Sequence, residues 1–378
     1  MKAAWFTDTW LPAMDGVVSS LLSFKEEIEK RGHKIYLFVP GENNIDDFDE
    51  GIFYYKASPF KKYPNYRMAS IFSIFCPRTK KIIRKIRPDI IHSHSPGVIG
   101  VHGVAASYKY GIPLIFTYHT FLEDSVYFAS PSPLIQDIAG RLLRAWLKWY
   151  FRRCNAIIAP SNAAKIEIGR LAEKIIEVVP TGINVDRFSY GKGMVARKEM
   201  GLGNEKVVLH VGRIVKEKNL DLLVDAAPLL LNDVPDAIFI IVGEGPYAES
   251  LKHKVKEMKL NKKFIFTGFI EDEKLPDYYK CADIFAFPSK YETQGIVAIE
   301  AMAAGLPVVA ARIRSLPEII EDGKCGFLFN PDDAHDFAEK MTMSLRAKEM
   351  PEKAKKFTME YSIEKCTDKL LSLYERFK

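Results

Sequence analysis

Short apolar runs alternate with amphipathic helical stretches along the whole chain, and this alternation limits the fold more than any other feature of the sequence. It is typical of repeated strand–helix–strand units, in which parallel strands form a sheet covered by helices. The pattern occurs twice and restarts near Lys206. A chain of 378 residues also exceeds what one hydrophobic core usually accommodates. We therefore expect an α/β protein of two domains, each a doubly wound parallel sheet.

The two series place the expected elements. The first predicts strands at 2–7, 34–39, 89–92, 113–118 and 156–159, and helices near 17–31, 77–86 and 134–153. The second predicts strands at 207–211, 237–242, 264–267, 284–287 and 307–310, and helices near 220–231, 247–258, 275–280 and 295–304. Gly- and Pro-containing segments between them place a linker at about 184–200. The predicted domains are 1–185 and 200–360, and a C-terminal helix at about 361–378 is expected to pack back on the first.

Composition limits the class of protein. With 48% hydrophobic and 27% charged residues, the chain reads as an ordered soluble protein. No window approaches the ~18–20 apolar residues of a spanning helix, and the start lacks the apolar stretch of a secretory signal. Five scattered cysteines without C-x-x-C spacing argue against a disulfide framework or a structural zinc site. We expect a cytoplasmic protein with no nucleic-acid partner, and the net charge of +6 indicates only an anionic ligand or surface.

Two cations follow the first strand of the second series, at Arg213 and Lys218. In open α/β sheets, ligands bind beyond the carboxyl ends of the strands. An arginine offers a planar fork of donors and a lysine a compact charge, here beside the positive N-terminus of the next helix. Together they could neutralise a diphosphate without a metal ion. The alternative is a solvated basic loop.

Two glutamates accompany the helix predicted near 295–304. Glu292 comes just before this helix, and Glu300 lies within it among apolar and small residues. A buried charge at Glu300 is costly unless it has a partner, and a ribose diol is a suitable one. The alternative is a pair of capping or surface carboxylates.

The segment G-R-x-x-x-E-K-N from Gly212, followed by Glu292 and Glu300, resembles the retaining GT-B glycosyltransferases of family 4. The resemblance covers essentially the whole chain. Three further pieces agree with it, namely the loop at 12–17, the strand end at 117–120 and the segment V-G-E-G-P at 242–246. It implies a GT-B fold of two Rossmann-like domains facing across a cleft. It also implies transfer of a sugar from a UDP- or GDP-linked donor, with no cofactor and no metal.

The resemblance also implies roles for the matching residues. His119 would lie by the sugar, Arg213 and Lys218 would hold the diphosphate, and Glu292 would bind sugar hydroxyls. The nucleotide sugar would further contact Gly16, Glu244, Gly295, Ile296, Val297 and Glu300. Many relatives have a pair of glycines where this chain has Asp15-Gly16. Asp15 is therefore a candidate for contacting the acceptor instead.

Other polar clusters favour no metal site. His92 and His94 alternate along an extended segment and so point the same way, as two metal ligands would. No third ligand is evident, so a structural role is preferred. The acidic stretch 46–49 resembles the D-x-D metal site of another glycosyltransferase fold, but it follows a turn rather than a strand end. We interpret it as a solvated loop.

The acceptor is expected to be a lipid. The loop at 119–128, which contains Glu123 and Asp124, and the segment E-T-Q-G at 292–295 resemble bacterial diacylglycerol glucosyltransferases. The helix predicted at 134–153 mixes cations with aromatics, as suits peripheral attachment to the inner face of the cell membrane, and its candidates are Arg144, Trp146, Lys148, Trp149 and Arg152. The alternative is that its aromatics fill the domain core.

The leading prediction is a hexosyltransferase, with glucose as the first candidate sugar and a lipid hydroxyl as acceptor. Its relatives are thought to react by front-face displacement, in which the leaving phosphate helps to deprotonate the acceptor. Transfer to a soluble sugar or sugar phosphate, for example by a mannosyltransferase, is the first alternative. A sugar-nucleotide epimerase and a binding protein without catalysis are further alternatives.

Overall fold

The computed structural model describes residues 1–60, 63–75, 77–121 and 132–378. This part of the chain forms two compact units: unit 1 comprises Met1–Gly182 and Ile363–Lys378, and unit 2 comprises Ile183–Ser362. The chain thus leaves unit 1 at Gly182, builds all of unit 2 and returns for its last helix. A Cβ atom on Gly182 would lie 2.6 Å from the Cα of Ile363, so the outgoing and returning segments pack too closely for a larger residue.

The sheet of unit 1 has the strand order β3-β4-β2-β1-β6-β7-β8-β9, and β5 pairs with β4. β3 and β5 are antiparallel to β4, and the other pairs are parallel. The strands are β1 Lys2–Phe6, β2 Lys34–Gly41, β3 Ile45–Asp47, β4 Ile52–Phe60, β5 Tyr63–Ala69, β6 Ile90–Ser93, β7 Leu114–Thr117, β8 Ala156–Ala159 and β9 Ile175–Val178.

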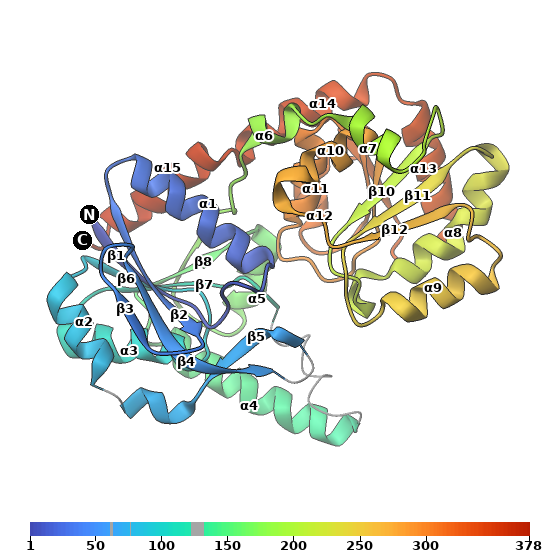
Figure 1. The fold of residues 1–378 in the computed structure, drawn as a ribbon. Helices are drawn as coiled ribbons and strands as arrows, with labels where there is room; N and C mark the ends of the chain where they lie inside the picture. The colour runs from blue at the N-terminus through green and yellow to red at the C-terminus, as the bar shows by residue number, and fades with distance from the viewer. Residues whose placement is uncertain (61–62, 76, 122–131) are drawn as a thin grey trace. The chain divides into compact units, whose positions relative to one another are not determined.

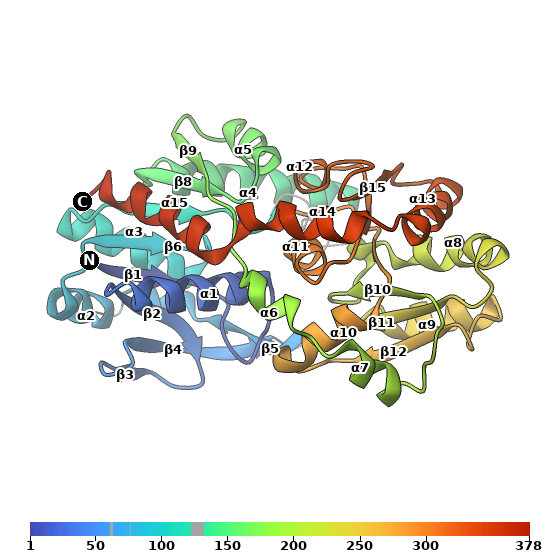
Figure 2. The ribbon, with the colours of Figure 1, turned by 90° about the horizontal axis from the view of Figure 1, so that it is seen from above.

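Helices cover both faces of this sheet, which explains why its strands read as continuous apolar runs. Ala3 and Trp5 of β1 point into one core and Ala4 and Phe6 into the other. α1 and α15 close the first core, and α2, α3, α4 and α5 close the second (Figures 1 and 2). The helices are α1 Gly16–Lys30, the 3-10 helix η1 Ile71–Phe75, α2 Arg78–Ile86, α3 Val98–Tyr110, α4 Pro133–Phe151, α5 Asn162–Gly169 and α15 Ile363–Glu375.

Unit 2 has a six-stranded sheet with the order β12-β11-β10-β13-β14-β15, parallel throughout. Its strands are β10 Val207–Val211, β11 Ile238–Val242, β12 Phe264–Gly268, β13 Ile284–Phe287, β14 Val308–Ala311 and β15 Gly326–Phe329. Figure 1 shows α8, α9 and α13 on one face and α10 and α11 on the other. The helices are α6 Val185–Ser189, α7 Gly193–Glu199, η3 Lys216–Lys218, α8 Leu220–Asp233, α9 Ala248–Glu257, η4 Asp272–Lys274, α10 Leu275–Cys281, α11 Ile296–Ala303, α12 Leu316–Ile319, α13 Ala334–Arg346, α14 Met350–Phe357 and η5 Thr358–Tyr361.

The strand order of each sheet reverses beside the unit's first strand. β1 lies between β2 and β6, and β10 lies between β11 and β13. In doubly wound sheets, successive connections run to opposite sides of such a switch point, and ligands bind there beyond the carboxyl ends of the strands. A ligand is therefore expected to contact the residues that follow β1, β6, β10 and β13.

The predicted fold class is confirmed: both units are α/β, with a largely parallel sheet in unit 1 and an entirely parallel sheet in unit 2. Every predicted strand and helix forms, with bounds that differ by at most three residues. Several elements were not predicted from the sequence, namely β3, β4, β5, β9 and β15 and helices such as α3 and α5. The segment 184–200, predicted as a linker, forms α6 and α7 and belongs to unit 2. The acidic stretch is not wholly a loop, because Asp46 and Asp47 lie in edge strand β3 and Asp46 pairs with Arg78.

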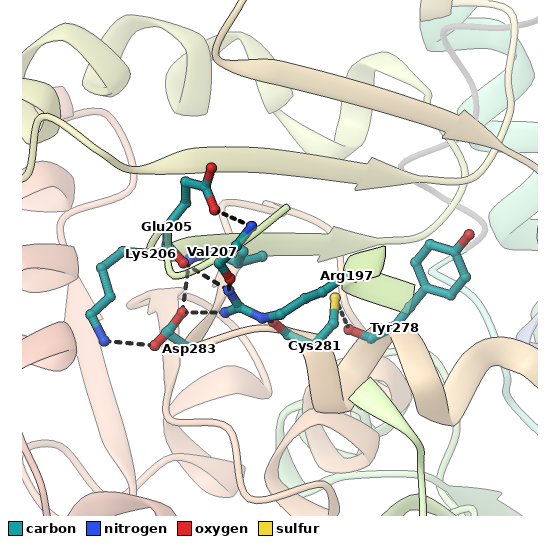
Figure 3. Close-up of polar contacts among 8 residues, drawn as sticks. Arg197, Glu205, Lys206, Val207, Tyr278, Cys281 and Asp283 are labelled. Atoms are coloured by element: carbon teal, nitrogen blue, oxygen red, sulfur yellow. Dashed lines mark hydrogen bonds and ion pairs between the residues drawn. The ribbon is translucent and has the colours of Figure 1, made fainter. Parts of the chain in front are cut away.

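Arg197 on α7 attaches this segment to the sheet of unit 2 (Figure 3). Its guanidinium donates to Asp283 at 3.0 Å and, at 2.8–3.0 Å, to the carbonyl oxygens of Cys281, Gly203 and Glu205. Asp283 also accepts from the Val207 amide at 2.8 Å and from the Lys206 ammonium at 2.9 Å. Because Asp283 precedes β13 and Val207 begins β10, the network joins the amino ends of the two switch-point strands.

We expect Arg197→Ala to destabilise unit 2 by about 3–5 kcal/mol, the cost of leaving one member of a largely buried ion pair without its partner. The side chains of Arg197 and Asp283 are only 14% and 23% exposed. Lys206→Ala is the matched control, because Lys206 contacts the same carboxylate but is 45% exposed and should cost about 0–1 kcal/mol. Urea unfolding of the full chain measures both, and equal losses would contradict the assigned role.

Candidate functional site

The switch point of unit 2 brings together two segments predicted to bind the donor. The loop after β10 carries Arg213 and Lys218, and the loop after β13 carries Glu292. β10 and β13 are adjacent parallel strands, so these loops leave the same edge of the sheet. The amide of Lys290 donates to the carbonyl oxygen of Glu217 at 3.3 Å, which links the loops directly.

Lys218 and Glu292 form an ion pair at this edge. The ammonium lies 2.5 Å from the carboxylate, and the two side chains are 21% and 12% exposed. Lys218 ends η3, after which Asn219 takes a left-handed conformation with φ 53° and α8 begins. On the other side, the Ser315 hydroxyl donates to the backbone carbonyl of Glu292 at 2.8 Å and fixes that loop. The pair is thus held in place by the backbone on both sides.

The glycines of the segment V-G-E-G-P have a packing role. A Cβ atom on Gly243 would lie 2.1 Å from the Gly212 carbonyl oxygen, and one on Gly245 would lie 2.2 Å from the Ile214 carbonyl oxygen. The Ile214 amide donates to the Glu244 carbonyl oxygen at 2.8 Å. The loops after β10 and β11 therefore interlock through their backbones, and this leaves the side chains of Arg213 and Glu244 exposed.

The N-terminus of α11 points its first amides, those of Ile296 and Val297, away from the helix without a side-chain cap. Gly295 precedes them with φ 90°, and a Cβ atom there would also press on Leu316 at 3.0 Å. Both the left-handed backbone and the tight packing require glycine at this position. An uncapped helix start is a favourable place for an anion or a sugar hydroxyl.

Glu300 lies within α11, and its carboxylate has a hydrogen-bond partner in the protein. The Tyr279 hydroxyl donates to its Oε2 at 2.8 Å. Burial is the largest influence on this carboxyl and raises its pKa to about 7, against the lowering effect of the Tyr279 hydrogen bond. The expected partner of Glu300 was a ribose diol, and Tyr279 on α10 is an additional one that the sequence did not reveal. Tyr279 accounts for part of the compensation that a buried carboxylate needs.

In unit 1, Asp15 is the N-cap of α1. Its Oδ1 accepts from the amides of Val17 and Val18, both at 3.0 Å, and its Oδ2 accepts from the Tyr66 hydroxyl at 3.1 Å. The carboxylate therefore occupies the amides that directly follow Gly16, the first residue of the helix. This capping gives Asp15 a structural role, and its contact with an acceptor stays a prediction.

His119 follows β7 and is half-buried. Its Nε2 lies 3.0 Å from Nδ1 of His94, and burial lowers the pKa of His119 to about 4, so its imidazole is neutral at pH 7. His92 and His94 are both buried and lie in the same core region as His119. Among the residues that the structure describes, no group of three or more histidines, cysteines or carboxylates is arranged to hold a metal ion.

The acceptor-side and membrane candidates have different outcomes. Glu123 and Asp124 lie outside the described residues. Lys148 on α4 and Arg152, which caps its C-terminus, are exposed, and Arg144 on α4 is half-buried. Trp149 packs partly against the second core of unit 1 and stacks on Trp146 at 4.7 Å between ring centroids. Trp146 is 38% exposed, whereas Leu147, Tyr150 and Phe151 of the same helix are buried in the core, so contact of the helix with a membrane stays a prediction.

Each unit matches a glycosyltransferase family model. Residues 14–187 match Glycosyltransferase Family 4, and residues 195–360 match Glycosyl transferases group 1. The chain belongs to the family 4 glycosyltransferases. This glycosyltransferase is also similar to HepE of Anabaena, whose structure in complex with UDP has a TM-score of 0.78 at 19% identity and covers 100% of both chains. That likeness shows the GT-B fold.

Curated relatives of the glycosyltransferase differ in the reactions that their names state. The alpha-monoglucosyldiacylglycerol synthase of Acholeplasma laidlawii is 29% identical over 346 residues, which cover 88% of this chain and 86% of the relative. The GDP-mannose-dependent alpha-mannosyltransferase of Corynebacterium glutamicum is 29% identical over 345 residues, which cover 90% and 78%. The enzyme accordingly transfers a sugar from a nucleotide sugar.

Two buried polar residues at the switch point of unit 2 were not predicted from the sequence of this glycosyltransferase. His210 on β10 and Ser289 after β13 are fully buried. Within the described part of the chain, His210 Nε2 and Ser289 Oγ have no hydrogen-bond partner. Unpaired buried polar atoms are uncommon in native proteins. The sequence indicates them only weakly: His210 is a polar residue within an apolar strand, and Ser289 is a polar residue shortly after one.

Glu300→Gln tests the burial of this carboxylate in the enzyme. Its pKa is about 7 in the folded protein and 4.5 ordinarily, so ionisation opposes folding increasingly from pH 4.5 to 7 and by a constant amount above pH 7. We expect Glu300→Gln to raise Tm at pH 8 by about 2–4 °C, the shift for about 1 kcal/mol in a unit of this size. The gain should shrink toward pH 4.5, and donor binding should weaken because an amide accepts less well from a diol.

Thermal unfolding at several pH values and calorimetric titration with nucleotide sugar measure these two effects. Glu249→Gln is the control, because the side chain of Glu249 on α9 is 86% exposed and its replacement should change neither. A stabilisation by Glu300→Gln that does not depend on pH would contradict the assignment.

Proposed function

We propose that this glycosyltransferase moves a hexose, with glucose as the first candidate, from a nucleoside-diphosphate donor to a hydroxyl group of a membrane lipid. The reaction retains the anomeric configuration and uses no metal ion. The observation that carries the proposal is the Lys218–Glu292 ion pair at the switch point of unit 2, beside Arg213 and the uncapped start of α11. A nucleotide sugar requires cations for its diphosphate and acceptors for its hydroxyls, and this edge of the sheet offers both.

Arg213 and Lys218 act on the diphosphate. Negative charge grows on the leaving phosphate as its bond to the sugar breaks, so fixed cations stabilise the transition state more than the bound substrate. The backbone bonds that interlock the loops after β10 and β11 hold these cations in place before the donor binds. Positive charge supplied in this way replaces the metal ion that other glycosyltransferases use.

Glu292 is better suited to binding than to attack. Its carboxylate is already paired with an ammonium group at 2.5 Å, which reduces its nucleophilicity and leaves its remaining lone pairs for sugar hydroxyls. Front-face displacement agrees with this arrangement: the acceptor oxygen bonds to the anomeric carbon on the side from which the phosphate leaves. The acceptor proton passes to the departing phosphate oxygen.

The lipid acceptor is supported by the similarity to a monoglucosyldiacylglycerol synthase and by the exposed face of α4. Leu134, Ile138 and Leu142 are 70%, 51% and 67% exposed, and their spacing of four residues places them on one side of the helix. The side chains of Arg141, Lys148 and Arg152 are also exposed. An apolar row accompanied by cations suits the surface of an anionic bilayer. None of the helices in the described residues is both long and apolar enough to span a bilayer.

We expect Arg213→Ala to lower kcat about 100-fold or more, the scale of losing one preorganised electrostatic group. The assay measures nucleotide release from a panel of UDP- and GDP-sugars, with and without diacylglycerol, in EDTA. The wild type should remain active in EDTA because side chains supply the positive charge. Lys216→Ala removes an exposed cation from the same loop and should change kcat little.

Wild-type turnover in Arg213→Ala would end the assignment of the diphosphate site, and loss of wild-type activity in EDTA would end metal independence. Activity with a GDP-mannose donor and a soluble acceptor would favour the second candidate, a mannosyltransferase like the Corynebacterium glutamicum relative.

Replacing Leu134, Ile138 and Leu142 together with glutamine should reduce co-sedimentation with vesicles of phosphatidylglycerol at least tenfold, because the bilayer contact loses its apolar part. Tyr108→Gln serves as the control, since Tyr108 on α3 is 93% exposed but lies outside this row. Glucosyl transfer to a water-soluble acceptor should be unaffected. Vesicle binding that persists in the triple variant would show that α4 is not the membrane surface.

A further inference from the structure

A chain of buried hydrogen bonds runs through the carboxyl ends of β1, β6 and β7. The Trp5 indole donates to the Tyr374 hydroxyl at 3.0 Å, and this hydroxyl lies 2.5 Å from Nδ1 of His92. Nε2 of His92 lies 2.7 Å from the Thr117 hydroxyl. Trp5, His92 and Tyr374 are at most 1% exposed and Thr117 is 7% exposed. The C-terminal helix thereby reaches the strand end that carries His119.

The direction of this chain follows from Trp5, because an indole N–H can only donate. Tyr374 accepts from Trp5 and has its own proton left, which it donates to His92 Nδ1. His92 must then carry its proton on Nε2 and donate to Thr117. This assignment gives a partner to each N–H and O–H group of Trp5, Tyr374 and His92, whereas the opposite tautomer of His92 would leave the Tyr374 proton without an acceptor.

His94 connects this core to His119. It follows β6, its amide donates to the Phe6 carbonyl oxygen at 2.8 Å, and its ring lies against Trp5 and His92 with centroid distances of 4.9 and 4.0 Å. Nδ1 of His94 faces Nε2 of His119 at 3.0 Å, with the two rings inclined by 24°. Burial lowers the pKa of both imidazoles, so one neutral ring donates to the other.

The far nitrogen of His94 decides which ring donates. His94 is 6% exposed, and its Nε2 has no hydrogen-bond partner within the described residues. If His119 were the donor, His94 would have to carry its proton on this nitrogen as a buried N–H without an acceptor. If His94 donates from Nδ1, its Nε2 is instead an acceptor without a donor. In protein interiors, backbone N–H groups without partners are rarer than carbonyl oxygens without partners. The same preference favours the tautomer in which His94 donates from Nδ1.

We propose that His94 is a positioning residue for His119: it donates its Nδ1–H to Nε2 of His119 and so fixes the proton of the neutral His119 ring on Nδ1. The tautomer does not rest on the proposed function, whereas the predicted contact of His119 with the sugar does. The packed rings of Trp5 and His92, held by Tyr374 of α15, keep His94 in the required orientation. The C-terminal helix α15 thus influences the orientation of His119 through two intervening residues.

The tautomer of His119 is measured directly by the 15N chemical shifts of labelled histidine in the full-length enzyme. The expected result is a neutral ring with the proton on Nδ1 in the wild type. His94→Leu should remove the donor and move the His119 population toward the Nε2–H form. His94→Asn, whose side-chain amide reaches the position of Nδ1, should restore the wild-type pattern. A wild-type His119 protonated on Nε2 would overturn the proposal.

His102→Asn is the matched control. His102 is a buried histidine of the same unit, but it contacts the hydroxyls of Ser73 and Thr79 rather than His119. Its replacement should leave the His119 signals unchanged. If both His94→Leu and His102→Asn shifted them equally, the effect would be a general loss of packing and the proposal would fail.

Activity gives a second, separable result. His94→Leu should lower kcat/KM about 10- to 100-fold, the scale of loss when a partner that orients a metal-ligating histidine is removed. His94→Asn should recover most of this loss. If His119→Ala retained wild-type turnover, the contact of His119 with the sugar that the sequence predicts would be wrong, yet the tautomer measurement would still test the role of His94.

Discussion

Helices cover both faces of each sheet, so most of its polar groups gather where the strands end. Trp5 and Ala4 of β1 show this directly, because neighbouring residues of one strand are buried in opposite cores. At the amino ends of β10 and β13, the Arg197–Asp283 network closes the edge with structural bonds. At the carboxyl ends of the same strands, the loops carry the Lys218–Glu292 pair and the buried hydroxyl of Ser289. In this sheet, the amino ends of the strands thus carry stabilising bonds and the carboxyl ends carry the candidate site.

The sequence predicted this architecture because its central strands are buried on both faces and read as uninterrupted apolar runs. Prediction from the sequence failed for elements that do not read as uninterrupted apolar runs. β4 and β5 form a partly exposed antiparallel pair that reads as mixed polarity, and β9 has an exposed start at Ile175. α3 is rich in small and apolar residues on every side, so its helical period is faint. Its start is fixed by tertiary contacts instead, because Asp8 accepts from the amides of Ile99 and Gly100.

The candidate site was predictable as a set of positions but not as a set of contacts. Arg213, Lys218, Glu292 and Glu300 could be selected because each follows or enters an apolar element at a strand end. The pairing of Lys218 with Glu292 spans 74 residues, and the bond from Tyr279 to Glu300 depends on how α10 packs on its neighbour. The capping of α1 by Asp15 was likewise not predicted, since this residue was chosen for its unusual place in a motif. Periodicity carries no information on such pairings.

The return of the chain to unit 1 has a consequence for its synthesis. Unit 2 is complete once Ser362 has been made, whereas unit 1 still lacks α15 at that point. Until then, the face of its sheet that α15 covers has no Leu370, Leu373 or Tyr374 to exclude water from Trp5 and Ile90. The half that begins first at the ribosome is therefore the half that matures last, and a chain cut short by a few residues would leave the earlier-made half, not the later one, incompletely folded.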